Sequence, residues 1–174
     1  MGDSLITIIA IFLAAILMFV FPLMSLSERS DDIAQLSIQT ATDDFVDNVR
    51  TTGKLTLDDW TQFIETASSG GIAVEPEIQL QILDENPGVK TTQAEMTKIG
   101  ENVYYNLYTS QVEDMLSKDK KIVLKEGDRI SVTVKNTNKT MAQILRNFFY
   151  TVAGNNSAEI TAKHAGIVTV NGNK

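Results

Sequence analysis

The chain has 174 residues, no cysteine, a net charge of −7 and a pI near 4.7. The acidic balance argues against a nucleic-acid binder, which would carry a basic face. The lack of cysteine excludes disulfides, thiol catalysis and thiolate metal sites, so the chain must fold by packing alone.

An uncharged apolar run, Leu5–Met24, begins close to the start of the sequence. A helix rises about 1.5 Å per residue, so a run of this length reaches roughly 30 Å, the thickness of a bilayer's hydrocarbon core. We therefore expect a transmembrane anchor over residues 1–25. A cleaved signal peptide is the alternative, with Ser25-Leu26-Ser27 as its processing site. However, a signal peptide begins with basic residues, and the only charged side chain before this apolar run is Asp3.

The segment that follows, residues 26–53, reads as an amphipathic stalk. It has neither Gly nor Pro before Gly53, and acidic residues separate its apolar ones. The apolar residues recur at helical spacing, which predicts one buried face: Ile33, Leu36, Ile38, Ala41, Phe45, Val46 and Val49. A glycine just past the last periodic residue usually ends a helix, and we expect Gly53 to do so.

Residues 54–174 then read as a head domain with mixed elements. Thr56 followed by Asp59 predicts a capped helix that places the sole tryptophan, Trp60, in the core. Glu77–Leu83 alternates as a strand, and Asp84–Gly88 is a turn before a polar stretch over 89–97 that is a loop or a frayed helix start. Val103–Ser117 has helical spacing, although its tyrosines would also suit a strand.

The second half of the head carries the strongest strand signals. Lys121–Lys125 and Arg129–Asn136 alternate on either side of Glu126-Gly127-Asp128, which predicts a β-hairpin. A helix beginning near Asn138 or Thr140 and ending at Gly154 follows, and a last strand, Ile160–Val170, is expected to bulge at Gly166. The predicted fold is α+β: a long N-terminal transmembrane helix continuing as the stalk, then a small, mainly antiparallel four-stranded sheet backed by helices.

The residues that chemistry would need are scarce. His164 is the only histidine, and its place in the alternation of Ile160 and Ala162 indicates a sheet residue at the rim of the core. No Gly-x-Ser-x-Gly elbow or phosphate-binding glycine loop occurs, so we expect no enzymatic activity and no cofactor. Acidic doublets such as Asp43-Asp44 lack the spacing of a calcium loop and suit a solvated helix face better, so no metal site is expected.

Charge is distributed unevenly along the chain. Between residues 26 and 85 there are 13 acidic and three basic side chains, whereas residues 86–174 carry eight acidic and 12 basic ones. We hypothesise that the acidic stalk and the basic distal region meet in assembly. The candidate interaction residues are Ile33, Ile38, Phe45 and Val49 on the stalk, and Lys118, Lys120, Lys121, Lys125 and Arg129 around the predicted hairpin.

An apolar helix of membrane length that runs into an amphipathic stalk and a small α+β head is the layout of pilins. Three stretches carry a more specific likeness: Met1–Leu5, the stalk segment Gln39–Arg50, and Arg146–Tyr150 together with His164–Val168. On these stretches the chain resembles TadE-like, pilin-like single-span proteins of tight-adherence (Tad) type IV pilus systems in Gram-positive bacteria.

The resemblance implies a pilin-like fold and a membrane-anchored structural or assembly subunit of a Tad-type pilus or secretion machine. Such proteins usually have a basic leader and a glutamate at the start of the apolar run, where this chain has Asp3, Leu5 and Thr7. That difference favours a minor pilin, a pseudopilin or an assembly factor over a major pilin.

The expected partners are the membrane through Leu5–Met24, other pilin-like subunits or copies of the same chain, and an assembly platform. The expected location is the cell membrane, with the C-terminal domain outside the cytoplasm and a possible place in a surface filament. The alternative is a membrane-anchored extracytoplasmic module that binds a ligand or a protein through its basic distal surface. Neither reading involves nucleic acid.

Overall fold

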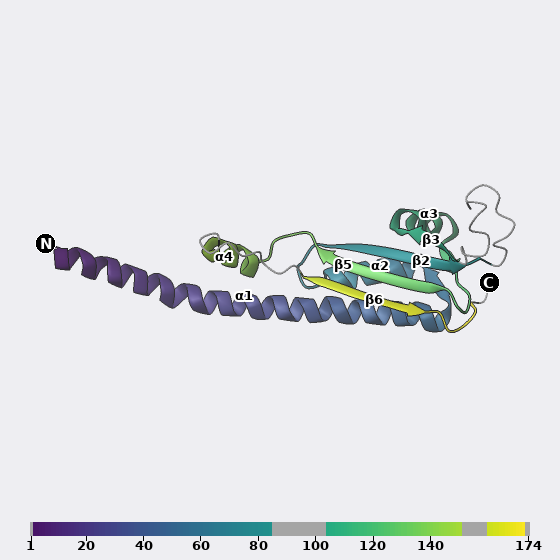
Figure 1. Ribbon diagram of the computed structural model, residues 1–174, viewed down its shortest axis with the longest axis horizontal. Helices are drawn as coiled ribbons and strands as arrows, with labels where there is room; N and C mark the ends of the chain where they lie inside the picture. The colour runs from purple at the N-terminus through teal and green to yellow at the C-terminus, as the bar shows by residue number, and fades with distance from the viewer. Residues whose placement is uncertain (1, 85–103, 151–159, 173–174) are drawn as a thin grey trace, which may run out of the picture.

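The computed structural model describes residues 2–84, 104–150 and 160–172. Its elements, in chain order, are α1 (Gly2–Thr52), β1 (Lys54–Thr56), α2 (Leu57–Ser68), β2 (Val74–Leu83), β3 (Tyr104–Tyr108), α3 (Thr109–Asp119), β4 (Lys121–Val123), β5 (Arg129–Asn136), α4 (Met141–Tyr150) and β6 (Thr161–Ile167). The helix α1 runs most of the length of the molecule, and the head gathers around its C-terminal half (Figure 1). An α+β chain with a long N-terminal apolar helix and a small antiparallel sheet is thereby confirmed.

The helix α1 is continuous through Pro22 and across the predicted boundary between anchor and stalk. It ends at Gly53 as expected: this glycine has φ = +64°, in the left-handed region, and its N–H donates to the Val49 carbonyl at 2.9 Å. Glycine reaches that conformation without the steric penalty of a side chain. The segments predicted to be an anchor and a stalk therefore form one continuous helix.

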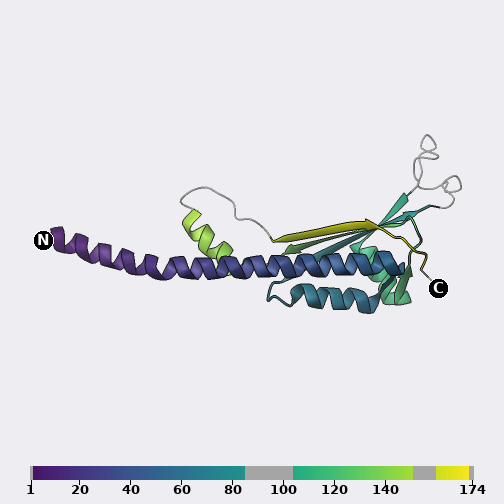
Figure 2. The ribbon, with the colours of Figure 1, turned by 90° about the horizontal axis from the view of Figure 1, so that it is seen from below.

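Four strands form an antiparallel sheet in the order β3-β2-β5-β6. Alternate residues of these strands point to one face of the sheet and are buried there: Ile78, Leu80, Ile130, Val132, Val134 and Ala162. The helices α1 and α2 lie on this face (Figure 2), where α1 packs mainly on β6 and β5.

An aromatic cluster joins α1, α2 and the core. Thr56 caps α2 through a reciprocal capping box with Asp59, as predicted. This cap orients α2 so that Trp60 and Phe63 meet Phe45 of α1, with ring centroids 5.7 and 4.5 Å away. The placement of Trp60 in the core against the stalk is confirmed.

The predicted β-hairpin between residues 121–125 and 129–136 is wrong. The strand β4 pairs with β1, and β5 pairs instead with β2 and β6. The buried carboxylate of Asp128 explains the change of direction, because it accepts hydrogen bonds from the backbone N–H of Lys125 at 2.7 Å and of Leu83 at 2.8 Å. The turn is thus bound to the end of β2, and β4 leaves the sheet.

The predicted helix over 103–117 is also wrong in its first part. Residues Tyr104–Tyr108 form β3, and the helix α3 begins only at Thr109. Aromatic side chains favour strands, and the edge of β2 offers hydrogen-bonding groups to this segment. The later helical residues Val112 and Leu116 are buried as the spacing indicated.

The bulge expected at Gly166 does not form, since Gly166 pairs one-to-one with Ile130. The glycine instead leaves room for the side chain of Arg50, which crosses β6 there and would collide with a Cβ. The Arg50 guanidinium Nε donates to the Ile167 carbonyl at 3.1 Å.

The helix predicted to begin near Thr140 is α4, and Thr140 caps it: its hydroxyl accepts from the Gln143 N–H at 3.2 Å, and the Gln143 amide oxygen accepts from the Thr140 N–H at 3.1 Å. The predicted end at Gly154 lies outside the described residues, as do the loop over 89–97 and most of the turn at 84–88.

Candidate functional site: the long helix and its contacts

The first half of α1 stands clear of the head, and its apolar side chains are bare. Over its most apolar window no residue is buried, and by length and composition the helix could cross a membrane, a property it shares with signal sequences. Large side chains such as Phe12 and Phe19 are exposed all around this part of the helix. Exposed apolar surfaces of this extent are characteristic of segments that contact a membrane or other protein chains.

The second half of α1 has two faces. Ile38, Phe45 and Val49, which we named as candidate interaction residues, are buried in the core of the head. Ile33, the fourth stalk candidate, is 63% exposed. The predicted stripe is therefore split: three members pack within the chain and one remains available to a partner.

Ile33 belongs to a second stripe, which the sequence reading did not separate from the first. Leu26 and Leu36 are 66% and 68% exposed, and their spacings of seven and three residues from Ile33 place all three on one side of the helix. At 100° per residue this side lies roughly opposite Ile38 and Phe45. We call Leu26, Ile33 and Leu36 the outward stripe. It continues the bare apolar surface of the first half along the head.

The predicted basic residues lie at the distal end of the head but on separate elements. Lys118 lies in the last turn of α3, Lys120 is its C-cap residue with φ = +62°, and Lys121 opens β4. Arg129 lies on β5, with its guanidinium carbon 4.8 Å from the centroid of the Tyr104 ring, and Lys125 lies in the turn between the two strands. The five side chains are exposed.

One of these bases already has an acidic partner. The Lys118 ammonium donates to the Asp114 carboxylate at 2.6 Å, one helical turn away. This hydrogen bond and the negative charge of Asp114 raise the pKa of Lys118 above its usual value. Both side chains are largely exposed, so the pair contributes little to stability.

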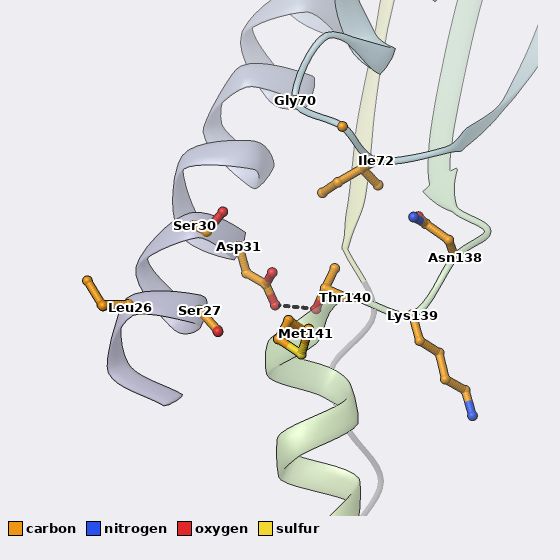
Figure 3. A pocket seen from close by; sticks show the side chains of 11 residues that line it. Leu26, Ser27, Ser30, Asp31, Gly70, Ile72, Asn138, Lys139, Thr140 and Met141 are labelled. Carbon is orange, nitrogen blue, oxygen red and sulfur yellow. Dashed lines mark hydrogen bonds between the residues drawn. The ribbon is translucent and has the colours of Figure 1, made fainter. Parts of the chain in front are cut away.

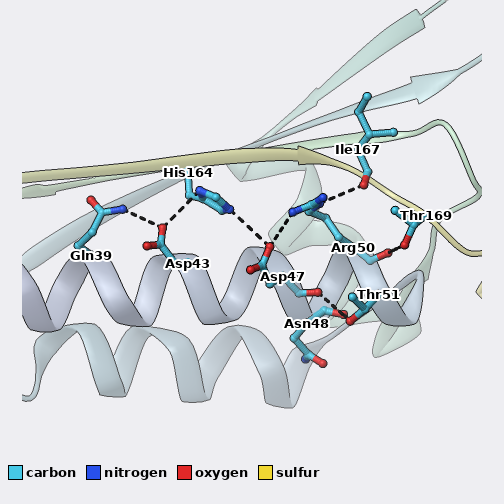
Figure 4. A network of polar contacts seen from close by, with 9 residues as sticks. All are labelled: Gln39, Asp43, Asp47, Asn48, Arg50, Thr51, His164, Ile167 and Thr169. Atoms are coloured by element: carbon cyan, nitrogen blue, oxygen red, sulfur yellow. Dashed lines mark hydrogen bonds and ion pairs between the residues drawn. The ribbon is translucent and has the colours of Figure 1, made fainter.

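A polar seam fastens β6 to α1 (Figure 4). His164 lies between two acids that are one helical turn apart, with Nδ1 3.3 Å from the Asp43 carboxylate and Nε2 3.5 Å from that of Asp47. Arg50 donates to the same Asp47 oxygen at 2.7 Å. Gln39 donates to Asp43 at 2.8 Å, so the carboxylates are held from both ends of the seam.

The seam holds β6 against α1. Both ring nitrogens of His164 face carboxylates, and the longer contact, to Asp47, is an ion-pair distance without a hydrogen bond. Within residues 2–84, 104–150 and 160–172, no three His, Cys, Asp or Glu side chains come close enough to hold a metal ion. The sequence placed His164 on a sheet face correctly; the i, i+4 spacing of Asp43 and Asp47 was the signal that could have predicted its partners.

At the base of the head, α1 meets α4 around an open cavity of about 370 Å³ (Figure 3). The Thr140 hydroxyl donates to the Asp31 carboxylate at 2.7 Å across its edge. The cavity is also lined by Ser27, Ser30 and the turn from Gly70 to Ile72. Nothing in the sequence predicted a contact between these segments.

No family model, curated protein or solved structure matches this chain.

Proposed function

We propose that this chain is a membrane-anchored, pilin-like structural or assembly subunit, a minor pilin or pseudopilin, of a Tad-type pilus or secretion machine. It is a single-pass protein of the cell membrane, and its head lies on the extracytoplasmic side. Its partners are other pilin-like subunits or copies of itself, together with an assembly platform.

The observation that carries this proposal is the division of α1. One unbroken helix is bare and apolar over its first half and forms part of the head core over its second half. Such a rod couples the head rigidly to whatever surrounds the apolar half. That environment is the bilayer before assembly and neighbouring helices after it, since both can cover apolar side chains.

The outward stripe supports assembly over simple anchoring. A helix that only tethers a domain needs no apolar side chains on its solvent face beyond the membrane, yet Ile33 and Leu36 lie about 14 and 18 Å past Met24 along the axis, at about 1.5 Å per residue. Both are largely exposed. A helix of a neighbouring subunit packed along this side would bury them together with the bare first half.

Membrane retention tests the anchor. The native protein should remain in membranes through an alkaline carbonate wash and keep a mass that includes Leu5–Met24. A mature protein that begins at Glu28 would contradict the anchor and favour the signal-peptide reading.

Cross-linking in the native host tests assembly. The chain has no cysteine of its own, so Leu36→Cys places one thiol on the outward stripe, and Ser117→Cys places one on the exposed surface of α3 as a matched control. We expect Leu36→Cys to form disulfide-linked or bifunctionally linked species with another copy or a related subunit. Equal linking of the two variants, or none in either, would argue against the stripe as an assembly surface.

A second candidate function is a membrane-anchored module that binds a ligand or a protein. The observation in its favour is the second face of the sheet, over which no helix of the described segments lies (Figure 2). A shallow hollow of about 370 Å³ occurs there, lined by Gln79, Gln81, Arg129 and Ile167 among others. An anchored chain that never cross-links through Leu36→Cys would favour this function.

A further inference from the structure

The helix α4 lies where the apolar half of α1 ends. Its first residues are held to α1 by the hydrogen bond from Thr140 to Asp31. From there α4 runs obliquely back toward the N-terminal end of α1, away from the sheet (Figures 1 and 2). Among the described residues of the head, the C-terminal end of α4 is thus the part that lies nearest the proposed membrane.

The distances match a position in the headgroup layer. Asp31 is seven residues past Met24, which is about 10 Å along a helix axis. The polar layer of a bilayer is about 5 to 8 Å thick on each side of its hydrocarbon core. The helix α4 has ten residues, or a length of about 15 Å. Beginning just above this layer and directed toward it, α4 reaches into it.

The exposed face of α4 has the character that such a position requires. Met141 and Ile144, three residues apart on one side of the helix, are 58% and 49% exposed, whereas Ala142 and Gln143 are buried against the rest of the protein. Lys139, just before the helix, is exposed and basic. An apolar helix face next to a basic side chain is the composition of helices that lie in a membrane interface.

We propose that α4 is an interfacial foot: the helix enters the lipid headgroups with its exposed Ile144, beside the point where α1 enters the bilayer, while Met141 lies at the edge of this layer. With α1 the foot gives the head two points of contact with the membrane, which fixes the height and tilt of the head. The loop before α4 is hydrogen-bonded to the turn after α2: the Thr137 N–H donates to the Ala73 carbonyl at 2.8 Å, and the Ala73 N–H donates to the Asn138 side chain at 3.1 Å. These bonds connect the position of α4 to that of the sheet. The inference rests on the proposed anchor.

The test uses the full chain, with single cysteines carrying an environment-sensitive fluorophore, in vesicles of phosphatidylcholine and phosphatidylglycerol at a high lipid-to-protein ratio. A spin-labelled lipid with its nitroxide near the headgroup serves as quencher. The positions are Ile144→Cys on α4, Leu13→Cys in the bare half of α1 as the membrane control, and Ser117→Cys on α3 as the water control.

We expect the label at Ile144→Cys to shift to the blue on vesicle binding and to be quenched strongly by the headgroup nitroxide, while Ser117→Cys keeps the emission and intensity it has in water. The label at Leu13→Cys should be quenched best by a nitroxide deep in the acyl chains. If the deep nitroxide quenches the label at Leu13→Cys but the headgroup nitroxide does not quench the label at Ile144→Cys, the foot is overturned and the anchor is left intact. The lack of quenching at both would overturn the anchor as well, and shielding of Ile144→Cys that appears only at high protein density would assign the face to a second copy and overturn the lipid contact.

Discussion

The ring of Phe45 on α1 stacks on the ring of Phe63 on α2, with centroids 4.5 Å apart and planes inclined by 17°. Trp60, three residues earlier in α2, completes the cluster, with its ring centroid 5.6 Å from that of Phe63. The C-terminal half of α1 is therefore an internal element of the head and would be required for its folding even in the absence of a membrane.

Phe45→Ala should lower the free energy of unfolding by about 3 to 5 kcal/mol, the usual cost of removing a buried aromatic ring from a core. A chain that starts at Leu26, studied by chemical denaturation, gives the measurement without lipid. Leu36→Ala on the opposite side of the same helix is the matched control and should change stability by no more than about 0.5 kcal/mol. Equal losses in the two variants would contradict packing of α1 within its own head.

Gly53, which ends α1, has no room for a side chain. A Cβ at Gly53 would lie 2.5 Å from the Gly172 nitrogen and 2.6 Å from the Val170 carbonyl oxygen, both backbone atoms that cannot move independently. Gly71 has a similar left-handed conformation, φ = +73°, but has no atom within 4 Å of such a Cβ.

Gly71→Ala should therefore cost only the penalty of the left-handed backbone, about 1 to 2 kcal/mol. Gly53→Ala should cost clearly more, because the C-terminal segment must also move away. Thermal or chemical unfolding of both variants checks this, and a Gly53→Ala loss no greater than that of Gly71→Ala would show that the C-terminal segment yields freely.

The local features of the fold were readable from the sequence because each depends on neighbouring residues. The stop at Gly53, the cap at Thr56 and the alternation of β5 all follow from backbone preference and periodicity. The partners of the strands were not readable. Lys121–Val123 alternates as well as a hairpin strand would, and its pairing with β1 depends on the buried Asp128 and on contacts made by the distant Gly53.

The candidate site was predicted only in part, because local patterns do not show which distant segments will meet. Helical spacing identified Ile33 and Phe45 as apolar positions of the stalk, but spacing alone does not say which side the head will cover. The structure assigns Phe45 to the core and leaves Ile33 exposed. The seam of His164 with Asp43 and the tie of Thr140 to Asp31 join residues more than 100 positions apart, a separation at which local patterns carry no information.

Ala14→Arg tests the bare half of α1. A charge at the middle of the bilayer costs about 2.5 to 3.5 kcal/mol on insertion scales, so this variant should be recovered mostly outside the membrane fraction. Ser25→Arg, at the end of the apolar run, is the control, because a long basic side chain there reaches the headgroups. Full membrane retention of Ala14→Arg after a carbonate wash would mean that this half of the helix does not cross the bilayer core.

The uneven distribution of charge between the stalk and the distal end of the head can be tested by charge reversal. If the basic residues of α3 and β4 meet the acidic side of another stalk, reversing Lys118, Lys120 and Lys121 to Glu should slow association of subunits at low salt. Each exposed ion pair contributes only about 0 to 1 kcal/mol, so the charges act together on encounter and orientation while the outward stripe supplies most of the affinity.

Raising the salt from 0.1 to 1 M shortens the Debye length from about 10 Å to about 3 Å and should remove most of the difference in association rate between the triple variant and the unchanged protein. Reversing Lys135, Lys139 and Lys163 makes the same change in net charge away from α3 and β4 and should have a smaller effect. Equal association rates for the two triple variants at low salt would show that the basic residues of α3 and β4 have no specific part in assembly.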